Sequence, residues 1–327
     1  MRGMVIEKPG AELQLRELPI PSPIGAEVLV KVRACAVCRT DLHVLDGELP
    51  QIAYPVIPGH QVVGEVVAGG PDAVRQADTS VGISWLGSSC GSCRYCEHAQ
   101  ENLCDAASFN GYTVNGGYAE YMLADSRYCF ELQHGQAAIQ TAPLLCGGLI
   151  GYRSLCKADD AQRIGIYGYG SAAHLVTQLA KHQGREIYAF TRPGDEAAQQ
   201  FAMQTGAVWA GNSDDIAPEL LDAAIIFAPV GDLVPKALRD IRKGGVVVCG
   251  GIHMSDIPAF PYKDLWGERR VCSVANLTRR DGEEFLALVK AAKVHAETTS
   301  YPFEKAPQAL EDLRCGRLKG TAVLIMN

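Results

Sequence analysis

The sequence has 327 residues, of which 47% are apolar and 20% charged, values that are ordinary for a globular protein with two domains. A formal net charge of −7 argues against a broad surface for nucleic acid or an anionic membrane. The chain reaches Glu7 and Pro9 before any apolar stretch, and no run approaches the roughly 18 apolar residues of a membrane-spanning helix. We therefore expect a cytoplasmic protein with no nucleic-acid or membrane partner.

The first half of the chain carries short β patterns separated by turns. Residues 28–34 and 62–67 are rich in valine and predict strands, and a Gly-Gly-Pro-Asp turn follows at residues 69–72. Helical periodicity is scarce before about Leu144. This half is therefore expected to be mainly β.

The second half alternates strands with amphipathic helices. Strands are predicted at 164–167, 186–190, 223–227 and 245–249, and helices at 172–179, 198–202 and 234–241. This alternation predicts an α/β unit with a parallel sheet over about residues 151–271. A helix at 283–293 and a final strand at 322–326 follow, and we expect that strand to rejoin the N-terminal β domain.

Four of the twelve cysteines crowd into one short segment with the spacing C-x2-C-x2-C-x7-C: Cys90, Cys93, Cys96 and Cys104. Four thiolates so close in sequence can surround one tetrahedral Zn²⁺ and leave no position open, which predicts a structural zinc site. An iron–sulfur cluster is the alternative, but its bacterial signature has a shorter last gap and a following proline, where this chain has Asp105.

Further candidate metal ligands are scattered along the chain: Cys38, His60 and Cys146. Each is weak evidence alone, because a buried cysteine is more often a small core residue. Together with the four-cysteine segment and the α/β unit they are far more specific.

With these residues the chain resembles the zinc-containing medium-chain alcohol dehydrogenases over essentially its whole length. The motifs that carry the resemblance are Cys38-Arg-Thr-Asp-Leu-His43, Gly59-His60, the segment Cys90 to Cys104, Gly116-Gly-Tyr-Ala-Glu-Tyr121, Cys146 and Gly168-Tyr-Gly-Ser-Ala-Ala173. The resemblance implies a GroES-like, mainly-β catalytic domain at 1–150 and 272–327, with a structural zinc lobe at 87–105. It implies a Rossmann-type, doubly wound cofactor domain at 151–271.

By that resemblance Cys38, His60 and Cys146 bind a catalytic zinc, so that each chain holds two zinc ions. Asp41 fixes the tautomer of His60, and Thr40 and His43 relay a proton through the cofactor ribose. Three protein ligands leave a fourth position for the substrate oxygen, where zinc makes an alkoxide accessible near neutral pH. The expected reaction moves a hydride between a small alcohol or aldehyde and a nicotinamide dinucleotide.

Gln61 departs from the family pattern, which usually has glutamate after the histidine ligand. Two thiolates balance the charge of Zn²⁺, and a nearby carboxylate would make the site net negative. One hypothesis is that zinc is therefore a slightly stronger Lewis acid in this chain. The other is that position 61 simply tolerates either residue.

The motif of Gly168, Gly170, Ser171 and Ala172 lies between a predicted strand and a predicted helix, the context in which backbone N–H groups hold a pyrophosphate. The second strand of this unit ends in Thr191 and Arg192 without the acid typical of NAD enzymes, which favours NADP over NAD. Gly250, Gly251 and Ile252 end a further strand and are expected beside the nicotinamide. Arg39 and Lys319 match family positions that contact the pyrophosphate.

Three aromatic residues are candidates for the substrate pocket: Trp85, Phe109 and Tyr112. An aromatic wall favours primary or aromatic alcohols and aldehydes, although such residues are as often part of a core. The short chain resembles the tetrameric microbial enzymes more than the dimeric animal ones, so a homo-oligomer is expected. The alternatives are a quinone or enoyl reductase of the same superfamily, against which the metal residues argue, and a non-catalytic zinc- and dinucleotide-binding sensor.

Overall fold

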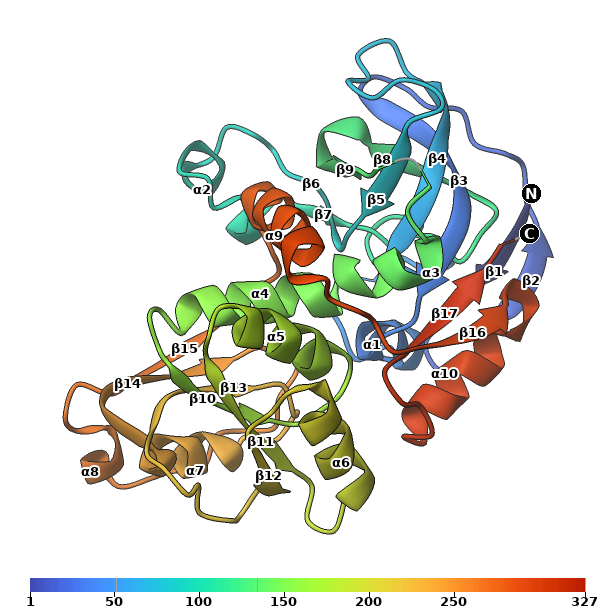
Figure 1. The fold of residues 1–327 in the computed structure, drawn as a ribbon. Helices are drawn as coiled ribbons and strands as arrows, with labels where there is room; N and C mark the ends of the chain where they lie inside the picture. Colours follow the sequence, from blue (N-terminus) through green and yellow to red (C-terminus); the bar gives the residue numbers. More distant parts are fainter. Residues whose placement is uncertain (51, 134, 327) are drawn as a thin grey trace. The chain divides into compact units, whose positions relative to one another are not determined.

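The computed structural model describes residues 1–50, 52–133 and 135–326. They form two compact units (Figure 1). The first comprises Met1–Cys146, Asn276–Glu283 and Ala296–Asn327, and the second comprises Gly147–Ala275 and Glu284–His295.

A seven-stranded sheet forms the centre of the first unit, in the order β16-β17-β3-β4-β5-β9 with β8 also paired to β3. Its strands are β3 (Glu27–Ala36), β4 (Val62–Gly69), β5 (Ser80–Ile83), β8 (Tyr121–Asp125), β9 (Cys129–Glu131), β16 (Thr298–Pro302) and β17 (Thr321–Ile325). Strand β17 runs antiparallel to β3, with Val323 opposite Ala36. The final strand therefore returns to the N-terminal β unit, as the sequence predicts.

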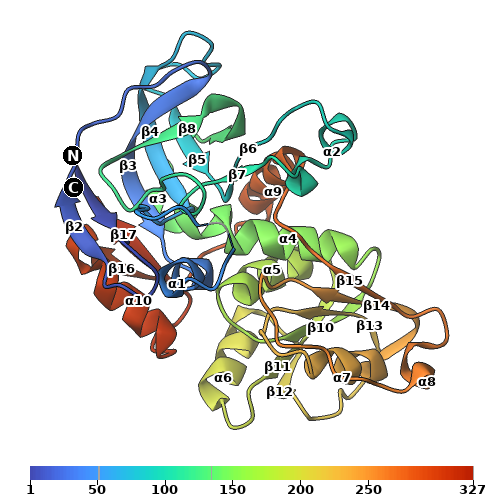
Figure 2. The same cartoon turned by 180° about the vertical axis from the view of Figure 1, so that it is seen from behind.

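Short elements surround this sheet. The strand pairs are β1 (Arg2–Val5) with β2 (Gln14–Glu17) and β6 (Leu86–Ser88) with β7 (Ser108–Phe109). The α-helices are α1 (Arg39–Asp46), α2 (Arg94–Glu97), α3 (Ala138–Thr141) and α10 (Ala306–Arg314). The 3₁₀ turns are η1 (Glu101–Leu103), η2 (Ser126–Tyr128), η3 (Ala142–Leu145) and η4 (Phe303–Lys305). In both views the C-terminal elements β16, β17 and α10 lie beside β1 and β2 (Figures 1 and 2), where Arg2 pairs with Glu304 at 2.6 Å.

The second unit is built on a six-stranded, all-parallel sheet in the order β12-β11-β10-β13-β14-β15. Its strands are β10 (Arg163–Tyr167), β11 (Glu186–Thr191), β12 (Trp209–Asn212), β13 (Leu221–Ile226), β14 (Ile241–Cys249) and β15 (Arg270–Ser273). Numbered along the chain the order is 3-2-1-4-5-6, the arrangement of the Rossmann fold. The strand order reverses between β10 and β13, the position at which such sheets bind ligands.

Helices flank this parallel sheet: α4 (Gly147–Lys157), α5 (Ser171–His182), α6 (Glu196–Thr205), α7 (Leu233–Asp240) and α8 (Tyr262–Leu265). Because α5 and α6 connect strands that progress in one direction and α7 connects strands that progress in the other, right-handed crossovers put them on opposite faces. Fully buried strand residues such as Ile166, Phe190 and Ile225 form the core between the layers. The mainly-β unit and the Rossmann unit confirm the predicted fold class.

Several elements differ from the predicted boundaries. Helix α1 and strands β12 and β15 were not predicted, and helix α7 ends at Asp240, so that Ile241 begins β14. Helix α9 (Arg279–Ala292) begins four residues before the predicted start, because Thr278 and Asp281 cap it. The helix includes Gly282, where a Cβ would lie 2.2 Å from the Phe130 ring. Among the residues described, no helix is long and apolar enough to cross a membrane.

Candidate metal centres and dinucleotide site

Three of the predicted ligands come together in the first unit. Cys38 is the N-cap of α1, His60 lies two residues before β4, and Cys146 directly follows η3. One donor atom from each lies within 4.8 Å of the other two, and Cys38 Sγ is 3.2 Å from His60 Nε2. Two sulfurs and one imidazole nitrogen at this spacing fit one Zn²⁺ and leave a coordination position unused.

The electrostatics of this cluster also fit a cation. Sharing of a proton with Cys146 and the charge of His60 hold the pKa of the Cys38 thiol well below its usual range. Burial would lower the pKa of His60, but the Cys38 thiolate and the Asp41 carboxylate raise it to about 10. Without a metal the site must therefore hold a proton between buried anions, and a bound metal ion would displace that proton.

Asp41 lies directly behind His60. Its Oδ1 is 3.2 Å from His60 Nδ1, and both side chains are essentially inaccessible to solvent. Its Oδ2 accepts hydrogen bonds from Cys38 N at 2.9 Å and from the Tyr118 hydroxyl at 3.2 Å. Because Nδ1 faces a carboxylate, Nε2 is the imidazole nitrogen directed at the metal position.

Gln61, the departure from the family pattern, is also buried, with 1% of its surface exposed. Its backbone carbonyl accepts Ala36 N at 3.0 Å, while its side-chain Nε2 has no hydrogen-bond partner among the described residues. The residue after the candidate ligand His60 is thus a buried neutral amide in place of a carboxylate.

Thr40 and His43 lie one turn apart on helix α1, so their side chains share a face. His43 Nδ1 hydrogen-bonds Glu48 Oε2 at 2.5 Å, and the Glu48 side chain is half exposed. Glu48 was not singled out from the sequence. An acid five residues after a histidine carries no spacing signal, and the left-handed Gly47 that ends α1 is what turns Glu48 back towards His43.

The three predicted pocket aromatics pack together. Trp85 stacks on Tyr112 with ring centroids 5.4 Å apart and on Phe109 at 5.5 Å. Trp85 and His60 make an edge-to-face contact, with ring centroids 4.9 Å apart. The aromatic cluster therefore adjoins a candidate metal ligand, the place where a substrate wall would be needed.

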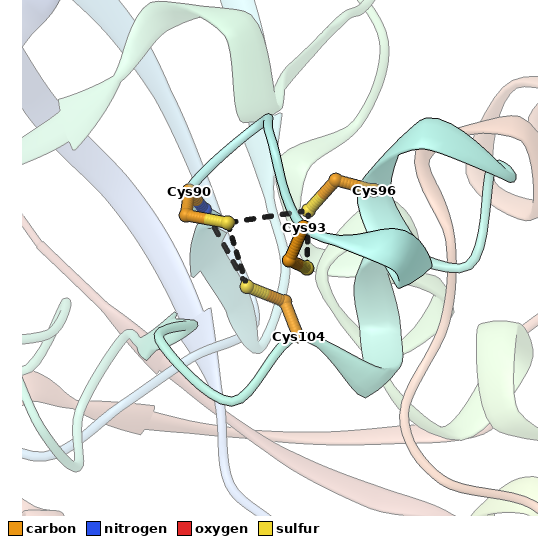
Figure 3. Close-up of side chains that lie close together, drawn as sticks. All are labelled: Cys90, Cys93, Cys96 and Cys104. Carbon is orange, nitrogen blue, oxygen red and sulfur yellow. Dashed lines mark hydrogen bonds between the residues drawn. The ribbon is translucent and has the colours of Figure 1, made fainter.

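The four clustered cysteines surround a single point (Figure 3). Their sulfurs are separated by 3.9 Å for Cys90 and Cys96, 3.6 Å for Cys93 and Cys96, and 3.5 Å for Cys90 and Cys104. A tetrahedral Zn²⁺ with bonds of about 2.3 Å requires sulfur separations of about 3.8 Å. The amide of Ser92 is the main cause that lowers the pKa of Cys90 to about 6. The donor set and its spacing thus fit a closed zinc site.

The predicted dinucleotide residues lie along the carboxyl edge of the parallel sheet. Gly168 follows β10 with φ at +90°, and a Cβ there would be 2.8 Å from Ala228 N, so only glycine fits. Gly170 is the N-cap of α5, which begins with Ser171 and Ala172, and the space next to its Cα is open. The N–H groups at the N-terminus of a helix suit a phosphate.

The ends of the neighbouring strands place the remaining cofactor candidates at the same edge. Thr191 ends β11, and its Oγ1 donates to Gly211 O at 3.2 Å, while Arg192 is exposed just beyond it. Gly250, Gly251 and Ile252 follow β14, two strands away from β10.

Two predicted cofactor contacts belong to the other unit. Arg39 and Lys319 are exposed residues of the first unit, and their contact with a pyrophosphate stays a prediction.

The structure thus has a mainly-β unit with two donor clusters that fit metal ions, and a Rossmann unit. Residues 25–134 match the alcohol dehydrogenase GroES-like domain. The chain is 43% identical over 316 residues to a probable alcohol dehydrogenase, AdhA, of Mycobacterium tuberculosis, covering 94% of this chain and 91% of that one. It is 33% identical to an alcohol dehydrogenase of a Moraxella species, with 99% of both chains covered.

A solved structure agrees with this relationship. The acetophenone reductase of Geotrichum candidum in complex with NAD superposes with a TM-score of 0.88 at 28% identity, covering 99% of this chain and 97% of that one. The chain belongs to the zinc-containing medium-chain alcohol dehydrogenase family. The family assignment made from the sequence motifs is confirmed.

Proposed function

We propose that this chain is a zinc-dependent alcohol dehydrogenase and aldehyde reductase that acts on small primary or aromatic alcohols and prefers NADP to NAD. The observation that carries the proposal is the cluster of Cys38, His60 and Cys146, three donor atoms within 4.8 Å with a buried carboxylate behind the imidazole. A purely structural site would close its coordination with a fourth side chain, as the four-cysteine lobe does.

In this proposal the first unit binds the metal ions and the second unit binds the dinucleotide. Cys38, His60 and Cys146 of the first unit would hold a catalytic zinc, and Cys90, Cys93, Cys96 and Cys104 a structural one. The loop at Gly168 and the strand end at Thr191 in the second unit would hold the dinucleotide. When bound, zinc supplies a Lewis acid for the substrate oxygen and the nicotinamide supplies the hydride acceptor or donor.

The chain's own residues handle the proton. Thr40 Oγ1 would accept the hydroxyl proton of the alcohol, and the ribose of a bound cofactor would connect Thr40 with His43, as the family resemblance implies. Nδ1 of His43 then exchanges the proton with Glu48 Oε2, whose half-exposed carboxylate passes it to water. We add Glu48 to the relay on the strength of that 2.5 Å contact.

The substrate class follows from the aromatic cluster. Trp85 packs beside His60 and stacks on Phe109 and Tyr112, and the three rings carry no charge to recognise a polyol or an acid. The Geotrichum relative, named for a ketone with an aromatic ring, has the same fold at 28% identity. We include a homotetramer in the proposal, as the resemblance to the microbial enzymes of the family implies.

The test combines metal analysis with turnover of the purified protein. We expect two zinc ions per chain and a change in nicotinamide absorbance with at least one member of a panel of aliphatic and aromatic alcohols and aldehydes. Cys146→Ser should keep one zinc and lose turnover. Cys129→Ser is the matched control, because Cys129 is buried outside both clusters and contacts Asp125 O.

Two outcomes would contradict the proposal. A Cys146→Ser variant that keeps both zinc ions and full turnover would show that the cluster is not the catalytic centre. Two zinc ions with no turnover on any substrate would favour a zinc- and dinucleotide-binding sensor.

A further inference from the structure

The two oxygens of the Asp41 carboxylate have different partners. Oδ1 faces His60 Nδ1 at 3.2 Å, whereas Oδ2 accepts Cys38 N at 2.9 Å and the Tyr118 hydroxyl at 3.2 Å. The carboxylate is 1% exposed, so no bulk water competes for these positions. Rotation of the carboxylate is therefore limited by two donors on the oxygen that does not face His60.

Tyr118 is tied to the segment that carries His60. Three consecutive backbone hydrogen bonds of 2.7–2.9 Å join residues 116–118 to residues 57–59. Gly59 has φ at +98°, and a Cβ there would lie 2.3 Å from the Tyr118 ring, so the glycine makes room for the aromatic side chain. The same backbone hydrogen bonds thus position the segment next to His60 and the Tyr118 hydroxyl, which donates to the Asp41 carboxylate.

The hydroxyl of Tyr118 has no evident packing purpose. The ring is fully buried in the core of the first unit, where phenylalanine would fill nearly the same volume. Burial, together with the negative charge of Asp41, raises the pKa of Tyr118 well above its usual range, so the phenol stays protonated and donates to the carboxylate. A buried hydroxyl costs free energy unless it is paired, and Asp41 is the partner it has.

We propose that Tyr118 is a positioning residue for the catalytic metal centre, since its hydroxyl fixes the Asp41 carboxylate that orients His60. This inference rests on the proposed zinc at Cys38, His60 and Cys146. Loss of the hydroxyl leaves Oδ2 with only the Cys38 amide and lets the carboxylate turn. The imidazole then loses part of its orientation, and the zinc exchanges faster while its three ligands remain.

The experiment compares Tyr118→Phe with Tyr301→Phe. Both substitutions delete one phenol oxygen that donates to an aspartate, but Tyr301 donates to Asp312 at 2.8 Å, and neither residue belongs to a metal cluster. Zinc release from each holoprotein to a chromogenic chelator is followed over time, together with thermal unfolding. Substitution of a residue that hydrogen-bonds a ligand histidine typically lowers metal affinity by 10- to 100-fold. We therefore expect one of the two zinc ions to leave about 10-fold faster in Tyr118→Phe.

A second variant tests whether Tyr118 acts through Asp41. Asp41→Asn removes the charge behind His60, and its effect on zinc release should exceed that of Tyr118→Phe. The double variant should release zinc no faster than Asp41→Asn alone, because the hydroxyl then has no carboxylate to fix. Equal release from Tyr118→Phe and wild type, additive effects in the double variant, or the same acceleration in Tyr301→Phe would overturn the inference.

Failure of the proposed function gives a different result. If the wild-type protein holds only the zinc of the four-cysteine lobe, the catalytic centre itself is wrong. If wild type holds two zincs and Tyr118→Phe releases both at the wild-type rates, only the role of Tyr118 is wrong. Should Tyr118→Phe unfold, wild-type release rates in Asp41→Asn would be enough to reject the inference.

Discussion

We expect the proposed preference for NADP to depend on Arg192, the cation just beyond β11. Its side chain is exposed and has no ion pair or side-chain hydrogen bond among the residues described. The acid that follows in sequence, Asp195, is already engaged, because its Oδ1 accepts Ala198 N at 3.0 Å as the N-cap of α6. A free guanidinium without a competing carboxylate suits the 2′-phosphate of NADP.

The magnitude follows from this exposure. A hydrogen bond to a charged group contributes about 1.5–3 kcal/mol, which corresponds to roughly 10- to 150-fold in an equilibrium constant. Arg192 is solvated, so screening by water places the expected effect at the lower end of that range. We predict that Arg192→Ala lowers kcat/KM for NADP by about 10-fold and changes kcat/KM for NAD by less than about twofold.

The assay measures kcat/KM for both cofactors at a fixed substrate concentration and ionic strength. Arg163→Ala is the matched control, because Arg163 begins β10 at the opposite edge of the same parallel sheet and pairs with Glu186 and Glu219. The reasoning would be refuted by a ratio of NADP to NAD efficiency that Arg192→Ala leaves unchanged. A strong preference of the wild type for NAD, the cofactor in the Geotrichum structure, would refute it equally.

Four further changes test other parts of the structure. Glu48→Gln removes the acid that contacts His43. It should lower kcat by several-fold, roughly the effect of weakening one charged hydrogen bond, and change KM little. Stopped-flow turnover measures the change in kcat. Trp85→Leu should reduce kcat/KM for aromatic alcohols by about 2- to 10-fold more than for aliphatic ones, a ratio obtained by competition between the two substrates. Burial alone would raise the pKa of Asp222, but hydrogen bonds from two backbone amides and an arginine hold this pKa below its usual value. The stability that these hydrogen bonds confer is fully present above the pKa of Asp222 in the unfolded chain. It is lost as the pH falls through the lower pKa of the folded protein. Asp222→Asn should therefore cost about 1–3 kcal/mol in urea unfolding at pH 7 and show a smaller deficit only below about pH 4. Gln61→Glu should alter the pH–rate profile if the neutral amide strengthens the Lewis acid, and an unchanged profile and turnover would support a tolerant position.

The elements that would hold a dinucleotide could be predicted from the sequence because their signals are local. The strand, the glycine turn and the helix that follow one another at residues 163–182 each have a short-range cause: apolar β residues, a left-handed glycine and a 3.6-residue periodicity. The four-cysteine lobe is local for the same reason, since all its donors lie within residues 90–104. When the residues that determine an element or a site lie close together in sequence, it can be predicted without knowledge of tertiary contacts.

Helix α1 was missed because its cap is unusual. Cys38 occupies the N-cap and its sulfur accepts Thr40 N at 3.3 Å, while the Asp41 side chain accepts the Cys38 backbone N–H. This is a capping box in which cysteine replaces serine or threonine, so residue preferences do not reveal it. Tyr118 and Glu48 were missed for another reason, because their partners are fixed only when distant segments or a tight turn bring them together.

The same contrast separates the two proposed metal centres physically. The ligands of the four-cysteine lobe are joined by a short loop, so the chain loses little further entropy in gathering them once that loop is formed. The other cluster takes Cys38 from the start of α1, His60 from the turn before β4 and Cys146 from the end of η3, and it exists only while the β unit is folded around it. Binding of a metal ion at the dispersed cluster is therefore coupled to the tertiary structure, whereas binding at the lobe is coupled mainly to a local loop. We therefore expect a perturbation that loosens the β unit without unfolding it to release metal from the dispersed cluster before the lobe. The proposed role of the contact between Tyr118 and Asp41 concerns the dispersed cluster alone.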